Sequence, residues 1–367
     1  MTLRIGMLGY GFMGKAHTNA LDRLPLFFPD APSTDRHILV GRHEKSLAEA
    51  AERYDFTRIT DDWEEALDEI DVLLNLGPNH LHAEPSIAAL ERDIHVLCEK
   101  PLASTRDDAE RMAATADASN AVAGIGFNYR FVPAIRYAKR LIEAGELGEI
   151  RHFHGRYVNG FLTDETAGWS WRLSKEHAGA GALGDLGSHT IDLARYLVGD
   201  IVTVSGHTRT FTTERPFEWG DDGETREVDV DDAYSAQVDF DNGAMGVLQA
   251  SRQAHGETNN NNFEVHGTDG AVKFNLARLN ELEVHTGDNR GFQTVLITDD
   301  DDPYGDVWWP PGHVIGWEHT FVHEHEKFLT AIAENRAFSP DFADGAAVQR
   351  VISAIQQSDE SGQRVEL

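Results

Sequence analysis

Asp185 and His189 lie four residues apart where the run Gly181-Ala182-Leu183-Gly184 leads into a predicted helix. On a helix this spacing places both side chains on one face. A carboxylate beside an imidazole orients the ring and stabilises its charged form, which suits a proton acceptor in catalysis. The alternative is a helix-capping aspartate next to an unrelated histidine, because the chain has 18 histidines.

A second candidate, Lys100, lies in the tetrapeptide Cys98-Glu99-Lys100-Pro101 at the end of a predicted buried strand. Ligands of an open parallel sheet bind at the carboxyl ends of its strands, so this position predicts a place beside a cofactor crevice. The alternative is an ordinary surface lysine. That alternative is weakened because only seven of the 32 basic residues are lysine.

The segment Gly9-Tyr10-Gly11-Phe12-Met13-Gly14 follows the first predicted strand and opens a helix. In this context the G-x-G-x-x-G spacing is typical of a dinucleotide site, where the backbone approaches the pyrophosphate and the helix N-terminus faces it. The alternative is a glycine-rich turn with no ligand. His17 is expected to pack near the pyrophosphate.

The residues after the second predicted strand bear on which dinucleotide is bound. An acid that binds the adenosine ribose usually ends this strand, but here Val40 is followed by Gly41-Arg42-His43-Glu44-Lys45. Arg42 and Lys45 could hold a 2′-phosphate, so the sequence favours NADP. Glu44 leaves NAD open, and Arg42 could instead stack on adenine or point to solvent.

The elements that position these residues form two predicted domains. Residues 1–127 alternate short apolar runs with helical patterns, which predicts an α/β domain, a doubly wound parallel Rossmann sheet that binds a dinucleotide. The predicted strands are 4–8, 37–40, 70–76, 94–98 and 122–127. The predicted helices are 14–24, 45–53, 62–68, 82–92 and 105–117.

Residues 128–367 are predicted to form an α+β domain with a large, open and mostly antiparallel sheet, for substrate binding and oligomerisation. Asn242-Gly243 and Asp269-Gly270 are hairpin signals, and 214–230 and 299–312 are predicted loops. The predicted helices are 133–144, 188–198, 317–335 and 343–357. One predicted strand begins at Ile150. The other predicted strands are 201–211, 231–240, 244–253, 262–267, 271–276 and 281–286.

The charge excludes some partners. The formal net charge is −30, with 62 acidic residues, so the chain would repel nucleic acid and an anionic membrane surface. Abundant acid with little lysine predicts adaptation to high salt, and the alternative is an ordinary acidic cytoplasmic protein. A single cysteine, Cys98, forms no intrachain disulfide. With no signal peptide or membrane helix in evidence, we expect a cytoplasmic protein.

Taken together, the motifs resemble those of the Gfo/Idh/MocA oxidoreductases, which include glucose–fructose oxidoreductase and inositol dehydrogenase. The resemblance spans essentially the whole chain. The matching motifs are GYGFMGKAH, LGPNHLH, CEKP, FNYRF, WSWR and GDLGSHTID. Within the family the chain is most similar to members like levoglucosan dehydrogenase, through GALGD, ARYLVG, VDVDD, FEVHGTDG and FADG.

The resemblance implies a role for each matching residue. Lys100 would be the catalytic lysine that hydrogen-bonds the reacting hydroxyl, and Asp185 and His189 would complete the site, with His189 as proton acceptor. The pyrophosphate would be held by Gly9, Gly11, Phe12, Met13 and Gly14. The nicotinamide crevice would be bordered by Pro78, Asn79, His82 and Glu99. The junction of cofactor and substrate would be lined by Asn128, Arg130, Trp171 and Arg172. The chain departs from the family at Gly77, where a threonine is more common.

These residues predict an NAD(P)-dependent dehydrogenase that transfers a hydride between the cofactor and a secondary alcohol of a sugar, anhydrosugar or cyclitol. The alternatives are a keto-sugar reductase, a sugar oxidoreductase with tightly bound cofactor, and a non-catalytic NADP-binding regulator. No metal is expected. A homodimer or homotetramer is expected through the C-terminal sheet, using Val238, Phe240, Met245 and Val247.

Overall fold

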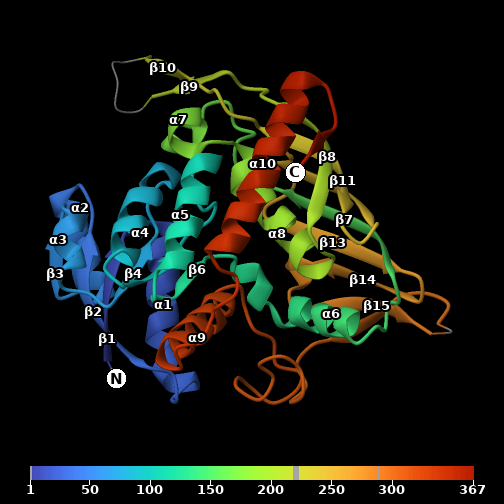
Figure 1. Ribbon diagram of the computed structural model, residues 1–367, viewed down its shortest axis with the longest axis horizontal. Helices are drawn as coiled ribbons and strands as arrows, with labels where there is room; N and C mark the ends of the chain where they lie inside the picture. Colours follow the sequence, from blue (N-terminus) through green and yellow to red (C-terminus); the bar gives the residue numbers. More distant parts are fainter. Residues whose placement is uncertain (1, 218–222, 288) are drawn as a thin grey trace. The chain divides into compact units, whose positions relative to one another are not determined.

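The structure is a computed structural model that describes residues 2–217, 223–287 and 289–367 (Figure 1). The chain forms two compact units. The first unit comprises Met1–Phe131 and Gly316–Ala347, and the second comprises Val132–Ile315 and Val348–Leu367. The predicted division into 1–127 and 128–367 remains a prediction about domains. It differs from these units chiefly because 316–347 groups with the N-terminal residues.

The first unit is built on a six-stranded parallel sheet with the strand order β3-β2-β1-β4-β5-β6, as predicted for a Rossmann domain. Leu8, Val40, Asn75 and Cys98 lie at one level across it, so the carboxyl ends of β1, β2, β4 and β5 share an edge. Its strands are β1 (Thr2–Leu8), β2 (Ser33–Val40), β3 (Arg58–Thr60), β4 (Val72–Asn75), β5 (His95–Cys98) and β6 (Ala123–Ile125).

Helices of the first unit connect these strands. Two of them begin at residues whose side chains accept backbone N–H groups, Asp62 at α3 and Thr105 at α5. The helix α9 belongs to this unit and packs against α1. The helical elements are α1 (Phe12–Phe27), α2 (Glu44–Tyr54), α3 (Trp63–Leu67), η1 (Asn79–Leu81), α4 (Ala83–Leu90), α5 (Arg106–Ala118), η2 (Asn128–Phe131) and α9 (His319–Ala333).

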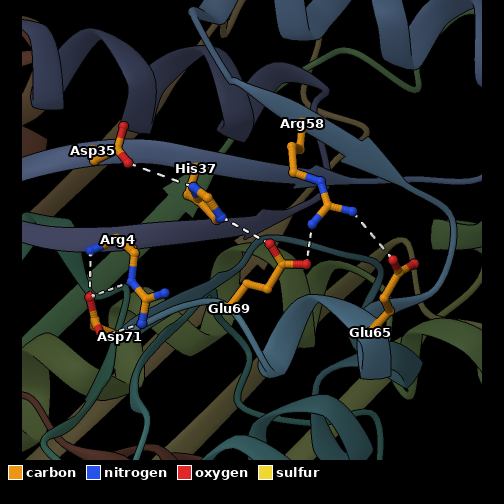
Figure 2. A network of polar contacts seen from close by, with 7 residues as sticks. All are labelled: Arg4, Asp35, His37, Arg58, Glu65, Glu69 and Asp71. Carbon is orange, nitrogen blue, oxygen red and sulfur yellow. Dashed lines mark hydrogen bonds and ion pairs between the residues drawn. The ribbon is translucent and has the colours of Figure 1, made fainter.

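A network of ion pairs joins the strands away from that edge (Figure 2). Arg4 of β1 holds the Asp71 carboxylate, with Nη2 and Oδ1 3.0 Å apart. His37 of β2 and Arg58 of β3 both reach Glu69. These side chains are partly exposed, so solvent screening leaves each pair only a small contribution to the free energy of unfolding.

The second unit contains a nine-stranded sheet in which only the β7–β12 pair is parallel among the described residues. The hairpins predicted at Asn242-Gly243 and Asp269-Gly270 are confirmed, since they join β11 to β12 and β13 to β14. The strands, in spatial order, are β16 (Gln293–Leu296), β15 (Glu281–Thr286), β14 (Gly270–Asn275), β13 (Asn260–Gly267), β7 (Ile150–Val158), β12 (Met245–Ser251), β11 (Ala233–Phe240), β8 (Ile201–Arg209) and β17 (Val365–Glu366).

Helices cover one face of this sheet. α6 and α8 pack on its strands, and Ile355 of α10 packs against Gly206 of β8. The helical elements are α6 (Pro133–Glu143), η3 (Trp171–Leu173), α7 (Lys175–Ala178), η4 (Leu183–Gly187), α8 (Ser188–Leu197), η5 (Leu276–Arg278) and α10 (Phe342–Ser361), which starts in the first unit.

The residues predicted to form an oligomer interface on the C-terminal sheet do not all lie on its exposed face, and the prediction is wrong at two of the four. Val238 and Phe240 are only 3% and 2% exposed, because they lie on the face that the helices cover. Val238 pairs with Gly246, so Met245 and Val247 point to the opposite face, where they are 47% and 37% exposed.

The predicted loop 214–230 contains a short hairpin of β9 (Glu214–Pro216) and β10 (Thr225–Glu227), and residues 218–222 lie outside the described part. The predicted loop 299–312 contains turns and bends. In the described ranges, no helix combines the length and apolar character needed to cross a membrane.

Candidate active site

Two of the three motif glycines in the glycine-rich turn occupy positions where a Cβ would clash with the backbone. Gly9 has a φ of +99°, and a Cβ on it would lie 2.6 Å from the carbonyl oxygen of Leu76. A Cβ on Gly14 would lie 2.9 Å from the carbonyl oxygen of Gly9, whereas Gly11 faces open space. Gly11 caps α1 without a side chain, so the first N–H groups of this 16-residue helix are left for an anion. The turn therefore fits a dinucleotide pyrophosphate.

Phe12 and Met13 begin α1 within this turn. Phe12 is 71% exposed and stacks on Trp317, with ring centroids 5.5 Å apart. Met13 is half-buried. The predicted pyrophosphate-binding segment is thus one continuous turn and helix start at the carboxyl end of β1.

Arg42 and Lys45 lie beyond the end of β2, where both are exposed, as is Glu44 at the start of α2. Gly41 leaves room for the ring of Tyr10, since a Cβ there would lie 2.2 Å from that ring. The hydroxyl of Tyr54 donates to the carbonyl of Tyr10 at 3.1 Å. This packing fixes the backbone beside Arg42 and leaves its side chain facing solvent.

The loops after β4 and β5 are joined by His82. Its Nδ1 lies 2.9 Å from the carbonyl oxygen of Pro101, and its Nε2 lies 3.0 Å from that of Gly77. Burial lowers the pKa of His82 below its ordinary value. Pro78 and Asn79 precede it in the same loop, with Asn79 buried. Gly77 is where this chain departs from the family pattern, and here its backbone carbonyl makes the contact with His82.

Glu99 and Lys100 follow β5 directly. The Glu99 carboxylate is buried, with Oε1 3.1 Å from His17 Nε2 and Oε2 accepting the Lys100 backbone N–H at 3.0 Å. Burial acts to raise the pKa of Glu99, but the hydrogen bond from His17 and the charges of His17 and Lys100 bring it below its ordinary value. Glu99 therefore carries a negative charge at neutral pH. His17 packs on this carboxylate, a partner that the sequence did not reveal.

Asn128 and Arg130 lie on η2 and are both buried. Asn128 Nδ2 donates to Thr320 Oγ1 at 2.9 Å, and Arg130 Nη1 lies 3.1 Å from Asp344 Oδ2. Both contacts tie η2 to the segment 316–347. The predicted contacts of these residues with cofactor and substrate stay predictions.

The second unit carries Asp185 and His189. The sequence predicts a single helix start here, but the structure has a π-helical turn, η4, which holds Asp185, followed by α8, which holds His189. π-helical turns occur frequently at functional sites. His189 is buried with its ring centroid 5.9 Å from that of Tyr157, while Asp185 is partly exposed.

A buried carboxylate anchors the segment before Asp185. Asp231 Oδ1 accepts the N–H of Gly181 at 2.7 Å, and Oδ2 accepts that of Leu183 at 2.8 Å. The Asp231 carbonyl accepts the N–H of Ala182 at 2.9 Å. A Cβ on Gly181 would lie 1.8 Å from that carbonyl oxygen, so only glycine allows the approach. Sequence reasoning missed Asp231, although VDVDD is one of the family motifs.

Trp171 and Arg172 lie on η3 of the second unit. The Arg172 guanidinium sits over the Trp171 ring, 4.4 Å from its centroid, a cation–π contact. Buried Arg252 donates from Nη1 to the Arg172 carbonyl at 3.5 Å. Nowhere in the described ranges do three or more His, Cys, Asp or Glu side chains gather as a candidate metal site.

The predicted site residues thus fall into two sets. Four belong to the second unit: Trp171, Arg172, Asp185 and His189. The remainder lie in the first unit, and those named after β1, β2, β4 and β5 follow the sheet edge at which Leu8, Val40, Asn75 and Cys98 are level.

Comparison with known proteins identifies the family. Residues 3–127 match the oxidoreductase family with an NAD-binding Rossmann fold, and residues 135–273 match the GFO/IDH/MocA C-terminal domain. Levoglucosan dehydrogenase of Pseudarthrobacter phenanthrenivorans is 41% identical, covering 97% of this chain and 96% of its own. D-xylose 1-dehydrogenase (NADP(+)) of Haloarcula marismortui is 32% identical, covering 57% of this chain and 54% of its own.

A solved structure agrees with these matches. Levoglucosan dehydrogenase in complex with NADH and levoglucosan superposes with a TM-score of 0.95 at 41% identity, over 100% of this chain and 99% of that chain. The resemblance predicted from the motifs is therefore confirmed at the level of sequence and of fold. The chain belongs to the Gfo/Idh/MocA family of oxidoreductases.

Proposed function

We propose that this enzyme is an NAD(H)-dependent dehydrogenase that oxidises a secondary alcohol of a sugar, anhydrosugar or cyclitol. The observation that carries the proposal is the position of Lys100. It follows β5 at the same sheet edge as the glycine turn, and its backbone is held by the buried Glu99 carboxylate. An ammonium donor beside a dinucleotide-binding turn suits alcohol oxidation.

In this proposal each residue has one task. His189 removes the proton of the reacting hydroxyl, and Asp185 orients the ring of His189. Lys100 donates a hydrogen bond to the same oxygen and stabilises its developing negative charge. The nicotinamide, when bound, accepts the hydride from the carbinol carbon. Asn128, Arg130 and Trp171 position the sugar, with hydroxyl contacts from the polar groups, and Arg172 binds the cofactor.

The substrate class is supported by relatives. A relative named levoglucosan dehydrogenase, 41% identical over nearly the whole chain, favours an anhydrosugar or a pyranose over a cyclitol. The keto-sugar reductase is the same chemistry in reverse. An oxidoreductase with a tightly bound cofactor is the further alternative, which would be visible as nucleotide retained through purification.

Four observations bear on the nucleotide. Arg42 and Lys45 are exposed beyond β2, which supports NADP, as does the relative named for NADP(+). The more similar relative has been solved with NADH, and Glu44 lies between the two cations in the sequence. NAD(H) is therefore the cofactor of this proposal, and NADP(H) is the alternative to be measured beside it.

Homo-oligomerisation through the second unit's sheet belongs to the same proposal. Exposed Met245 and Val247 on the uncovered face support it, although Val238 and Phe240 do not contribute. A cytoplasmic location, the absence of nucleic-acid and membrane partners and adaptation to salt stay predictions from the composition and charge.

The test is a panel of sugars assayed by the absorbance of the reduced nicotinamide. NAD⁺ and NADP⁺ are each supplied with levoglucosan, glucose, xylose and scyllo-inositol, at low and at molar salt. Lys100→Ala is expected to abolish turnover while the dinucleotide still binds, because the glycine turn is intact. Lys139→Ala, on α6, is the matched control and keeps wild-type turnover. Wild-type turnover in Lys100→Ala would overturn the assignment, and a silent panel with tight nucleotide binding would favour a regulator.

A further inference from the structure

A row of buried side chains from three elements lies next to Lys100 in the first unit. His325 of α9 and His17 of α1 are in contact, with Nε2 of the first 2.8 Å from Nδ1 of the second. His17 Nε2 lies 3.1 Å from Glu99 Oε1, and Glu99 Oε2 accepts the Lys100 N–H at 3.0 Å. His17, His325 and Glu99 are at least nine-tenths buried. The row therefore ends at the backbone of the proposed catalytic lysine.

The hydrogen bond between His17 and Glu99 can run in only one direction. An ionised carboxylate only accepts hydrogen bonds, so His17 donates from Nε2 to Glu99 whether its ring carries one proton or two. In the first case His325 donates to His17 Nδ1, and in the second it accepts. Burial lowers the pKa of His325 well below its ordinary value, which keeps this outer histidine neutral.

Among the titratable groups around this row, Glu99 is the one that carries a negative charge. Glu324 of α9 is a second acid that interacts with Glu99 through its charge. It is fully buried, and burial raises its pKa well above the ordinary value. Burial lowers the pKa of His82, from the loop before α4, below its ordinary value. Lys100 and His17 are the cationic or potentially cationic groups whose charges act on Glu99.

A glycine beside Glu99 makes room for its carboxylate. A Cβ on Gly126 would lie 3.0 Å from Glu99 Oε1 and 3.2 Å from its Cδ, so glycine at this position lets the carboxylate lie flat against the backbone. Both oxygens are thereby committed, one to His17 and one to the N–H of Lys100.

We propose that His17 and His325 are positioning residues for the reaction: they hold the Glu99 carboxylate in one orientation, and this fixes the Lys100 backbone and keeps a permanent negative charge beside its ammonium. The inference rests on the proposed function, in which Lys100 acts on the substrate oxygen. The inference adds to the proposed site two histidines that lie 308 residues apart in the sequence.

The experiment compares His17→Leu with His17→Gln in the full chain. The amide of glutamine can donate to Glu99 and accept from His325, whereas leucine can do neither. His17→Leu is expected to lower kcat by about 10- to 100-fold, with the dissociation constant of NADH changed less than about threefold. The alkaline limb of the pH profile of kcat/KM should move about one unit lower, and the acid limb should stay in place.

His17→Gln is expected to recover most of kcat and the wild-type alkaline limb. His95→Leu is the matched control. His95 is at the opposite end of β5, half-buried and accepting the N–H of Val122 at 2.9 Å, so its loss affects stability without touching the row. Equal pH profiles in His17→Leu and His95→Leu would overturn the inference.

His325→Leu provides a second measurement if His17→Leu does not fold. It leaves the His17–Glu99 contact in place but unrestrained, so a smaller shift of the alkaline limb in the same direction is expected. A profile identical to wild type would overturn the role of His325. An active wild type that Lys100→Ala silences and His17→Leu does not affect refutes the inference alone. A wild type that oxidises no sugar refutes the proposed function and the inference with it.

Discussion

Glu324 is a carboxyl group buried in the first unit without a hydrogen-bonding partner for either oxygen among the described residues. Burial, and then the charge of Glu99, raise its pKa well above the ordinary value. A carboxyl that keeps its proton in the folded state but loses it in the unfolded state makes stability fall as pH rises. The fall begins near the unfolded pKa of about 4.3 and ends at the folded pKa.

Glu324→Gln removes this pH dependence, because glutamine has no proton to lose. The stability of the variant relative to wild type is therefore expected to rise with pH between about pH 5 and pH 8, by up to about 1.4 kcal/mol per unit until the folded pKa is reached. Urea unfolding at a series of pH values measures the difference.

Glu334→Gln is the control for this prediction. Glu334 is exposed at the end of α9 and pairs with Arg336, so its replacement should give a nearly constant difference over the same range. A difference between Glu324→Gln and wild type that is flat in pH, or that falls, would show that Glu324 ionises normally in the folded protein.

Single residues show how far the sequence could predict the site. The places of Lys100 and of the glycine turn in the fold are predictable because each directly follows a strand with a clear apolar pattern. His325 and Asp231 are not, because each acts on a segment remote in the sequence: His17 for one and 181–183 for the other. His17 is predicted to lie near the pyrophosphate, but its Glu99 and His325 contacts depend on how α1, β5 and α9 pack.

At the scale of elements, the π-helical turn η4 depends on a carboxylate outside it. Asp231→Ala is expected to leave the N–H groups of Gly181 and Leu183 unpaired, at a cost of about 1–3 kcal/mol each in the free energy of unfolding. Because the same segment leads to Asp185 and His189, kcat should fall by at least about tenfold. Steady-state kinetics and urea unfolding measure the two effects.

The neighbouring residue offers a matched control. Asp232 is also buried, and its Oδ2 accepts the N–H groups of Phe211 and Thr212 at 2.7 and 3.0 Å. Asp232→Ala should destabilise the fold comparably while kcat stays near wild type. If the two variants lose kcat equally, the loss follows from general destabilisation rather than from η4.

Elements with a clear apolar pattern were predictable, whereas some short or irregular ones were not. The helix predicted at 317–335 is α9, His319–Ala333, and the strand predicted at 201–211 is β8, Ile201–Arg209. β3 and β9 have three residues each, too few to show a period. The π-helical form of 183–187 also has no signature in the sequence, since it depends on contacts with Asp231 and on packing against Tyr234.

For the whole molecule, the net charge of −30 predicts a response to salt. Raising KCl from about 0.1 M to about 1 M shortens the Debye length from about 10 Å to about 3 Å, which screens the repulsion among acidic residues. Screening also weakens exposed pairs such as Arg4–Asp71, but each contributes little. The thermal unfolding midpoint is therefore expected to rise over this range.

Betaine at equal concentrations is the control, because it carries no net charge and does not screen. The midpoint should rise more in KCl than in betaine, as followed by circular dichroism. A midpoint that falls or stays level in KCl would mean that self-repulsion does not limit stability, and would remove the main argument for adaptation to salt.

The composition of the first unit has a consequence for synthesis on the ribosome. Its sheet is complete at residue 125, but α9, which packs against α1 and supplies His325 to His17, is not made until residue 333. At that point residues 132–315 of the second unit have already been synthesised. The surface of α1 that α9 covers therefore stays uncovered until α9 has been made, so the order of the chain delays completion of the cofactor domain until most of the second unit has been synthesised.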